Sequence, residues 1–117
     1  MKRLHGFVIF VLLLIVVGTG FSHPPAVVEA EFSVADHVIT ILVKHASRDQ
    51  EAHFIDGITV VLNGKTVVEQ TFFSQMGKGK QEASYILHDA KPGDEITIIA
   101  TCNKYGEKKK KITVPSS

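Results

Sequence analysis

The sequence predicts an all-β protein: a seven-stranded immunoglobulin-like β-sandwich preceded by an N-terminal signal peptide. Three observations lead to this fold class. Beyond residue 22, short apolar segments alternate with turn residues at regular intervals. No stretch keeps a helical period long enough to form a helix. Seven short strands in about 90 residues are typical of a small immunoglobulin-like sandwich.

Each expected strand ends at a recognisable turn or polar loop. In residues 38–43, Ile39, Ile41 and Val43 alternate with Val, Thr and Leu, which suits a strand covered on both faces. Asn63-Gly64 joins two apolar segments and indicates a tight hairpin, because a type I′ turn needs positive φ at both central residues. A further turn is expected at residues 91–94, Lys-Pro-Gly-Asp. The expected strands are residues 26–32, 38–44, 54–62, 65–72, 82–87, 95–102 and 108–114.

The first 22 residues have the layout of a signal peptide. Lys2 and Arg3 precede an uncharged apolar run at residues 7–17, and small residues follow it. This run is too short to cross a bilayer, which needs about 20 apolar residues, so no stable membrane anchor is expected after cleavage. We therefore expect a periplasmic or secreted protein, with residues 1–22 as signal peptide and residues 23–117 as one domain. Cleavage after Ser22 would make His23 the new N-terminus.

The charge balance gives no indication of a nucleic-acid partner. The full chain has 13 basic and 12 acidic residues, and loss of Lys2 and Arg3 leaves the charge nearly balanced. The lysine run at residues 108–111 lies in an expected strand. Lysines protect the exposed edge of a sheet against pairing with another chain, so we interpret this run as a solvated edge strand.

Cys102 is the single cysteine of the chain, so it has no intramolecular disulfide partner in an oxidising compartment. Thiolate and neutral imidazole are ligands for zinc, copper and iron, which makes a metal site the main functional interpretation. His45 and His53 flank a polar loop between two expected strands, and Cys102 ends the sixth. Loops gather at the two poles of a sandwich, so these three side chains can meet at one pole. His23 lies only a few residues before the first strand and can reach the same place.

Three segments resemble the superoxide reductase (desulfoferrodoxin, neelaredoxin) family, in the same order along the chain. Residues 53–64 read HFIDGITVVLNG and are similar to the strand and hairpin that follow a histidine ligand in that family. Residues 101–106 read TCNKYG and resemble its iron motif, Cys-Asn-x-His-Gly. Residues 23–29 read HPPAVVE and are similar to its first-ligand segment, where His-x-Pro precedes a short strand.

This resemblance implies one mononuclear non-haem iron at the solvent-exposed end of the sandwich. In the family, four histidine nitrogens lie in a plane and a cysteine sulfur binds below, which leaves the sixth position open for superoxide. Mapped onto this chain, the family ligand positions fall on His23, His45, His53 and Cys102. The resemblance also implies superoxide as the small-molecule substrate and an external electron donor protein, because this chain has no Cys-x-x-Cys motif of its own.

The chain departs from the family pattern at two positions. Tyr105 replaces the last histidine of the iron motif, so one nitrogen is missing unless its phenolate binds instead. Ser22 replaces the lysine that precedes the first histidine in the family. Lys104 lies close to Cys102 in sequence and is a candidate catalytic residue, as a source of positive potential or of protons. The alternative interpretation, which the sequence favours, is a solvated loop lysine.

Three functions follow as alternatives. The first is an exported iron protein that reduces superoxide to hydrogen peroxide. The second is a non-enzymatic metal carrier or sensor on the same scaffold, because three histidines and one cysteine also suit zinc or copper. The third is an immunoglobulin-like interaction module whose histidines are incidental, in which case Cys102→Ser would leave metal content unchanged.

Overall fold

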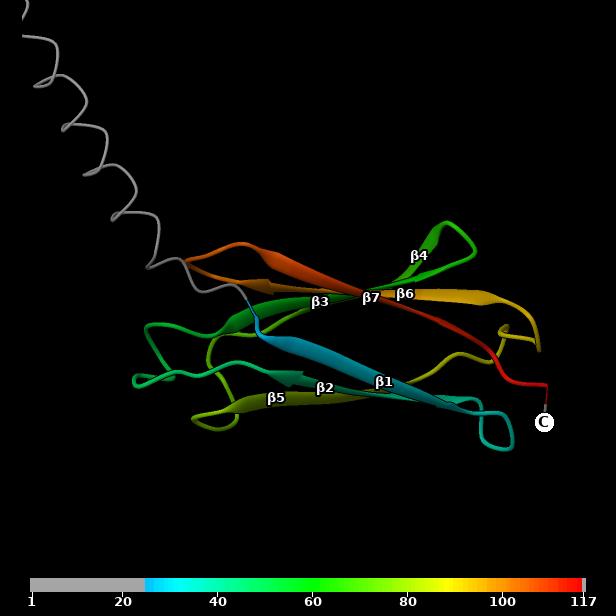
Figure 1. Cartoon of the computed structure of the whole chain (residues 1–117), viewed down its shortest axis with the longest axis horizontal. Helices are drawn as coiled ribbons and strands as arrows, with labels where there is room; N and C mark the ends of the chain where they lie inside the picture. Colours follow the sequence, from blue (N-terminus) through cyan, green and yellow to red (C-terminus); the bar gives the residue numbers. More distant parts are fainter. Residues whose placement is uncertain (1–24, 117) are drawn as a thin grey trace, which may run out of the picture.

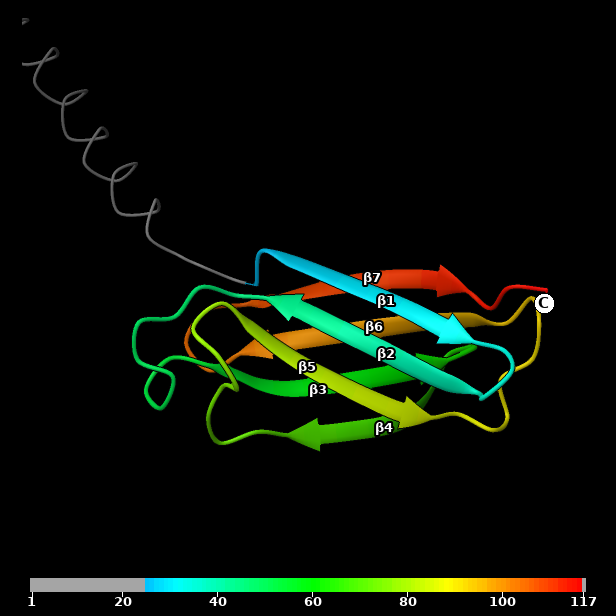
Figure 2. The same cartoon turned by 90° about the horizontal axis from the view of Figure 1, so that it is seen from below.

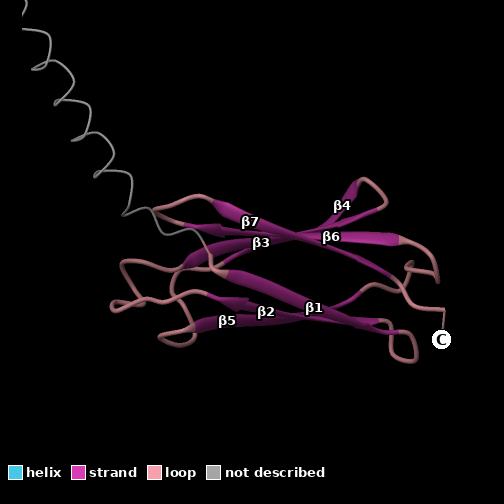
Figure 3. Cartoon of the chain, in the orientation of Figure 1, coloured by secondary structure: helices cyan, strands magenta, loops and turns pink. Residues whose placement is uncertain are grey.

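The computed structural model of the chain describes residues 25–116. The expected signal peptide, Ser22 and His23 lie outside these described residues and remain predictions. The described part is all β, as predicted, and contains seven strands and no helix (Figure 3). The strands are β1 Val27–Ser33, β2 Val38–Lys44, β3 Ile55–Leu62, β4 Lys65–Thr71, β5 Lys80–Ile86, β6 Glu95–Cys102 and β7 Glu107–Thr113.

The strands form two antiparallel sheets that face each other as the layers of a sandwich (Figure 1). One sheet has the order β1-β2-β5, and the other has the order β4-β3-β6-β7. The fourth strand, β4, pairs with β3 here. In the constant-type immunoglobulin domain, the fourth strand belongs instead to the sheet that contains the first and second strands. The strands β2 and β6 end at the same pole at which β3, β5 and β7 begin (Figure 2). We call this end of the sandwich the histidine pole.

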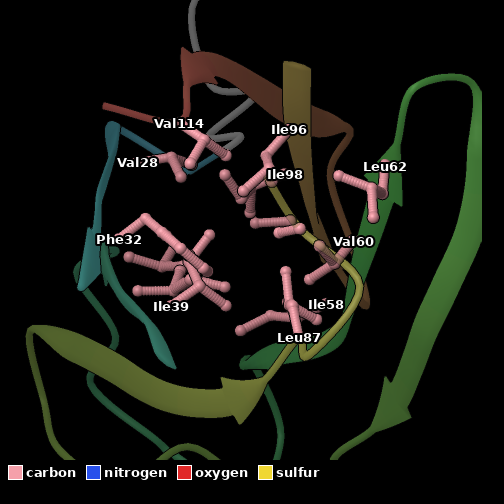
Figure 4. Close-up of a cluster of buried hydrophobic side chains, with 14 of the residues drawn as sticks. Val28, Phe32, Ile39, Ile58, Val60, Leu62, Leu87, Ile96, Ile98 and Val114 are labelled. Carbon is pink, nitrogen blue, oxygen red and sulfur yellow. The ribbon is translucent and has the colours of Figure 1, made fainter. Parts of the chain in front are cut away.

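Alternate residues of the strands fill the space between the sheets. Figure 4 shows side chains from both sheets meeting there, among them Phe32, Ile39, Ile58 and Ile98. The expectation that the second strand is covered on both faces was wrong. Only its inner residues are buried, and Thr40 on the outer face is exposed, because no layer covers that face.

Both turns that the sequence indicated are present. Asn63 has φ 49° and Gly64 has φ 87°, which are the positive values that the tight hairpin between β3 and β4 requires. Gly93, in the turn before β6, has φ 91°. A side chain at either glycine would be strained in this left-handed region of the backbone, although nothing near Gly64 or Gly93 would obstruct a Cβ atom.

The lysine-rich strand β7 lies at the edge of the larger sheet, and all four lysines at residues 108–111 are exposed. Lys108 is paired with Ala100 and Lys110 with Ile98, both of which face the core. The two lysines therefore lie on the inner side of an open edge, an arrangement that prevents pairing with further strands.

Within residues 25–116, no helix is long and apolar enough to span a membrane.

Candidate metal centre

His45 and Cys102 reach the histidine pole because each extends the inward-facing row of a strand. The buried residues of β2 are Ile39, Ile41 and Val43, and His45 continues that alternation one step beyond the strand. In β6, Cys102 continues the buried row of residues 96, 98 and 100. The side chains of His45 and Cys102 are only 2% and 8% exposed. A period of two thus directs an imidazole and a thiol from opposite sheets into the same space.

His53 completes a group of three donors. It precedes β3, whose first residue Ile55 is paired with Cys102 in the neighbouring strand. One donor atom from each of His45, His53 and Cys102 lies within 4.8 Å of the others. Donor atoms bound to one ion at about 2.0–2.3 Å are at most about 4.6 Å apart, so only a small closure would be needed to hold a metal. The two imidazole rings lie edge to face, with centroids 4.7 Å apart.

The loop after β2 is held in place by the segment before β5. The backbone N–H of His45 donates to the carbonyl oxygen of Gly79 at 2.9 Å, and that of Ser47 donates to Lys78 at 2.7 Å. The hydroxyl of Ser47 donates to the carbonyl oxygen of His53 at 2.5 Å. The two ends of the loop that separates His45 from His53 are therefore tied together.

Asn103 joins the cysteine turn to the segment that carries His53. Its side-chain oxygen accepts from the backbone N–H of Phe54 at 2.9 Å, and its amide group donates to the carbonyl oxygen of Ala52 at 3.0 Å. In the same turn, the backbone N–H of Lys104 donates to the sulfur of Cys102 at 3.4 Å. This hydrogen bond fixes the position of the sulfur within the turn.

The chemistry of the donor set fits a transition metal. The atom His45 Nε2 is buried and has no hydrogen-bond partner in the structure. A buried nitrogen without a partner costs free energy unless something satisfies it, and a metal ion would do so. Two imidazoles and a thiolate suit zinc, copper or iron, so the residues present are compatible with all three.

Tyr105 and Lys104, the remaining candidates among residues 25–116, lie around this group. The ring of Tyr105 packs edge to face against His53, with centroids 5.5 Å apart, and the residue is 37% exposed. Lys104 lines an open hollow of about 500 Å³ beside His53, together with Arg48 from the loop after β2. Arg48 did not emerge from the sequence, because an arginine in a polar loop carries no positional signal.

Gln75 was also missed. It lies between β4 and β5 in a polar segment without any periodic pattern, yet it is only 4% exposed. Its side-chain oxygen is 2.8 Å from Nδ1 of His45. The contact joins residues 30 positions apart, so nothing local in the sequence could have indicated it.

Solved structures of superoxide reductases superpose on this chain. Superoxide reductase (1Fe-SOR) from Giardia intestinalis matches with a TM-score of 0.58 and 20% identity, over 80% of this chain and 98% of that one. Superoxide reductase (neelaredoxin) from Ignicoccus hospitalis matches with a TM-score of 0.50 and 19% identity, over 82% of each chain. The fold is that of the superoxide reductases.

The identities to these superoxide reductases are low, so the similarity concerns the course of the backbone. No protein-family model matches the chain, and no curated protein matches its sequence. The superoxide reductase fold and the group of His45, His53 and Cys102 are thus two separate findings, one from the backbone and one from the side chains.

Proposed function

We propose that this chain is an exported, mononuclear non-haem iron protein that reduces superoxide to hydrogen peroxide, with His23, His45, His53 and Cys102 as metal ligands. The observation that carries the proposal is the meeting of two imidazoles and one thiol, within 4.8 Å, at one pole of a superoxide reductase fold. The layout of residues 1–22 supports export to the periplasm or the cell exterior.

The positions of Pro25 and Ala26 at the histidine pole support His23 as a ligand. Pro25 is fully buried, and the backbone N–H of Ala26 donates to the carbonyl oxygen of Lys44 at 2.9 Å. Lys44 directly precedes His45, so the chain enters the sandwich at the histidine pole. His23 is two residues before Pro25, and two residues span up to about 7 Å when extended.

When bound, a ferrous ion would supply the one electron that, together with two protons, converts superoxide to hydrogen peroxide, and an external donor protein would replace that electron. The chain contributes orientation and charge. The backbone N–H of Lys104 holds the sulfur of Cys102 in place by a hydrogen bond. Arg48 and Lys104 line the hollow beside His53 together with one carboxylate, Asp49, and the remaining positive charge attracts a small anion towards the site. Lys104 is also the candidate proton donor.

The test is metal content and superoxide consumption of protein purified without oxygen. We expect close to one iron per chain, and an electron paramagnetic resonance spectrum of mononuclear ferric iron that appears when superoxide oxidises the ferrous protein and is lost on addition of dithionite. The variant Tyr105→His adds the fourth imidazole and is expected to raise the rate of superoxide consumption at unchanged iron content. Protein that acquires no iron, from cells or from added ferrous salt, would end the proposal.

A second candidate is a metal carrier or sensor without enzymatic activity. Tyr105 favours it, because a partly exposed tyrosine ring lies against His53 where the family motif has its last histidine. A site with fewer nitrogens suits four-coordinate zinc or copper. Stoichiometric zinc or copper, together with no superoxide consumption by the iron-loaded protein, would favour the carrier over the reductase.

A further inference from the structure

Gln75 is a buried side chain whose hydrogen bonds all lead to the histidine pole. Its oxygen lies 2.8 Å from Nδ1 of His45 and accepts from the backbone N–H of Ile55 at 3.1 Å. Its nitrogen donates to the carbonyl oxygen of His45 at 2.9 Å and to that of Gly77 at 2.8 Å. One amide group thus joins the end of β2, the start of β3 and the turn before β5.

These partners leave the amide only one orientation. Both groups facing its nitrogen are carbonyl oxygens, which only accept, and the backbone N–H of Ile55 only donates. Exchange of the oxygen and nitrogen would place an NH₂ group against the N–H of Ile55 and an oxygen against two carbonyl oxygens. The group that faces Nδ1 of His45 is therefore an oxygen.

An oxygen facing Nδ1 requires a proton on that nitrogen. Neutral imidazole carries one proton, so a proton on Nδ1 leaves Nε2 with a lone pair. Nε2 is the buried atom of His45 that has no hydrogen-bond partner. We propose that Gln75 is a positioning residue: it holds His45 in the Nδ1–H tautomer and presents an unprotonated Nε2 to the metal centre.

The part of this inference that concerns metal affinity rests on the proposed function, whereas the tautomer belongs to the protein without metal. Free neutral histidine favours the opposite tautomer, with the proton on Nε2. Without Gln75, the proton would have to leave Nε2 before a metal could bind there. Loss of a partner that orients a histidine ligand typically lowers metal affinity by about 10- to 100-fold.

Two variants and a matched control separate positioning from folding. Gln75→Leu removes all four hydrogen bonds. Gln75→Glu keeps an oxygen that faces His45, loses the two donors and places its second oxygen against the carbonyl oxygens of His45 and Gly77, so it tests the tautomer alone. The control is Gln81→Leu, because Gln81 is also 4% exposed and bonds to the same connection, through the backbone N–H of Met76 at 3.0 Å, whereas its side-chain nitrogen donates to the carbonyl oxygen of Glu82 and not to His45.

The readout is ¹⁵N–¹H nuclear magnetic resonance of the histidine ring nitrogens in metal-free protein at about pH 8, above the usual histidine pKa of about 6.5. We expect the Nδ1–H tautomer of His45 in wild type, Gln75→Glu and Gln81→Leu, and a shift towards Nε2–H in Gln75→Leu. Zinc or ferrous iron titrations should show an affinity about 10- to 100-fold lower for Gln75→Leu than for Gln81→Leu.

An Nε2–H tautomer in the wild type or in Gln75→Glu would overturn the inference, and so would equal affinities of Gln75→Leu and Gln81→Leu. If Gln75→Leu does not fold, the tautomer of Gln75→Glu decides. A wild type that shows the Nδ1–H tautomer but binds no metal would end the proposed function and leave the assignment of Gln75 intact. Failure of the tautomer assignment and failure of the proposed function therefore give different results.

Discussion

Replacement of Cys102 by serine tests the metal centre most directly. The thiol is 8% exposed, and its sulfur lies within 4.8 Å of a nitrogen from each of His45 and His53. Serine has nearly the same size, so the packing around residue 102 should be preserved. Serine is not among the usual ligands of zinc, copper or iron in proteins, so the site would lose its one soft donor.

The expected magnitude follows from linkage between binding and folding. A metal present at 100 times its dissociation constant stabilises the folded wild type by about 2.7 kcal/mol. For a domain of this size, about 1 kcal/mol corresponds to about 4–8 °C in Tm, so the wild type should gain about 10–20 °C. Cys102→Ser removes a ligand itself, so its metal affinity should fall by more than the about 100-fold that loss of an outer partner causes. At the same metal concentration, the Tm of this variant should hardly rise.

The assay is thermal unfolding of metal-free protein with and without ferrous iron or zinc, followed by circular dichroism. His88→Ala is the matched control, because the side chain of His88 is 83% exposed and pairs with Asp89 at 3.2 Å, outside the metal group. An equal metal-induced rise in Tm for wild type and Cys102→Ser would refute the metal-centre reasoning. It would also favour the interpretation of the chain as an interaction module.

Three further predictions concern the framework of the site and the fold. Asn103→Ala removes the bonds to Phe54 and Ala52 and should cost about 1–2 kcal/mol in urea denaturation and weaken metal binding; unchanged affinity would contradict its proposed role. The N–H of Lys91 donates to Asp94 and holds the pKa of this carboxyl below 3.8, so its stabilisation is complete above that pH and is lost as the pH falls through the folded-state pKa. Asp94→Asn should therefore flatten the dependence of the urea midpoint on pH below about 4, and parallel curves would argue against this. Ile98→Ala, at a fully buried position, should lower the free energy of unfolding by about 2–5 kcal/mol, and a cost below about 1 kcal/mol would show that the core is packed differently.

The local signals in the sequence were sufficient for most of the strands. Alternating apolar residues gave the bounds of β2 and β6 as observed, and Asn63-Gly64 gave the hairpin between β3 and β4. The start of β5 was placed too late, at residue 82 instead of Lys80. The reason is that Gln81 occupies an inward, buried position with a polar side chain, which hides the alternation.

The candidate site was likewise predictable from the sequence only in part. Topology at the poles of a sandwich was enough to expect that His45, His53 and Cys102 meet, and these residues do lie together. The contact of Gln75 with His45 was not foreseeable, because it spans 30 positions and its segment has no pattern. The identity of the metal and the participation of His23 stay predictions.

The sequence by itself determined where strands and turns form, because period-two alternation and positive-φ turn residues act over a few neighbours. It also placed His45 just after one strand and Cys102 at the end of another, whereas the inward direction of both side chains came from the structure. Only the tertiary structure decided which polar groups surround them, as with the oxygen of Gln75 at Nδ1 of His45 and the amide of Asn103 at the His53 segment. These contacts depend on the packing of two sheets against each other, and packing at that range joins residues whose separation along the chain carries no local signal.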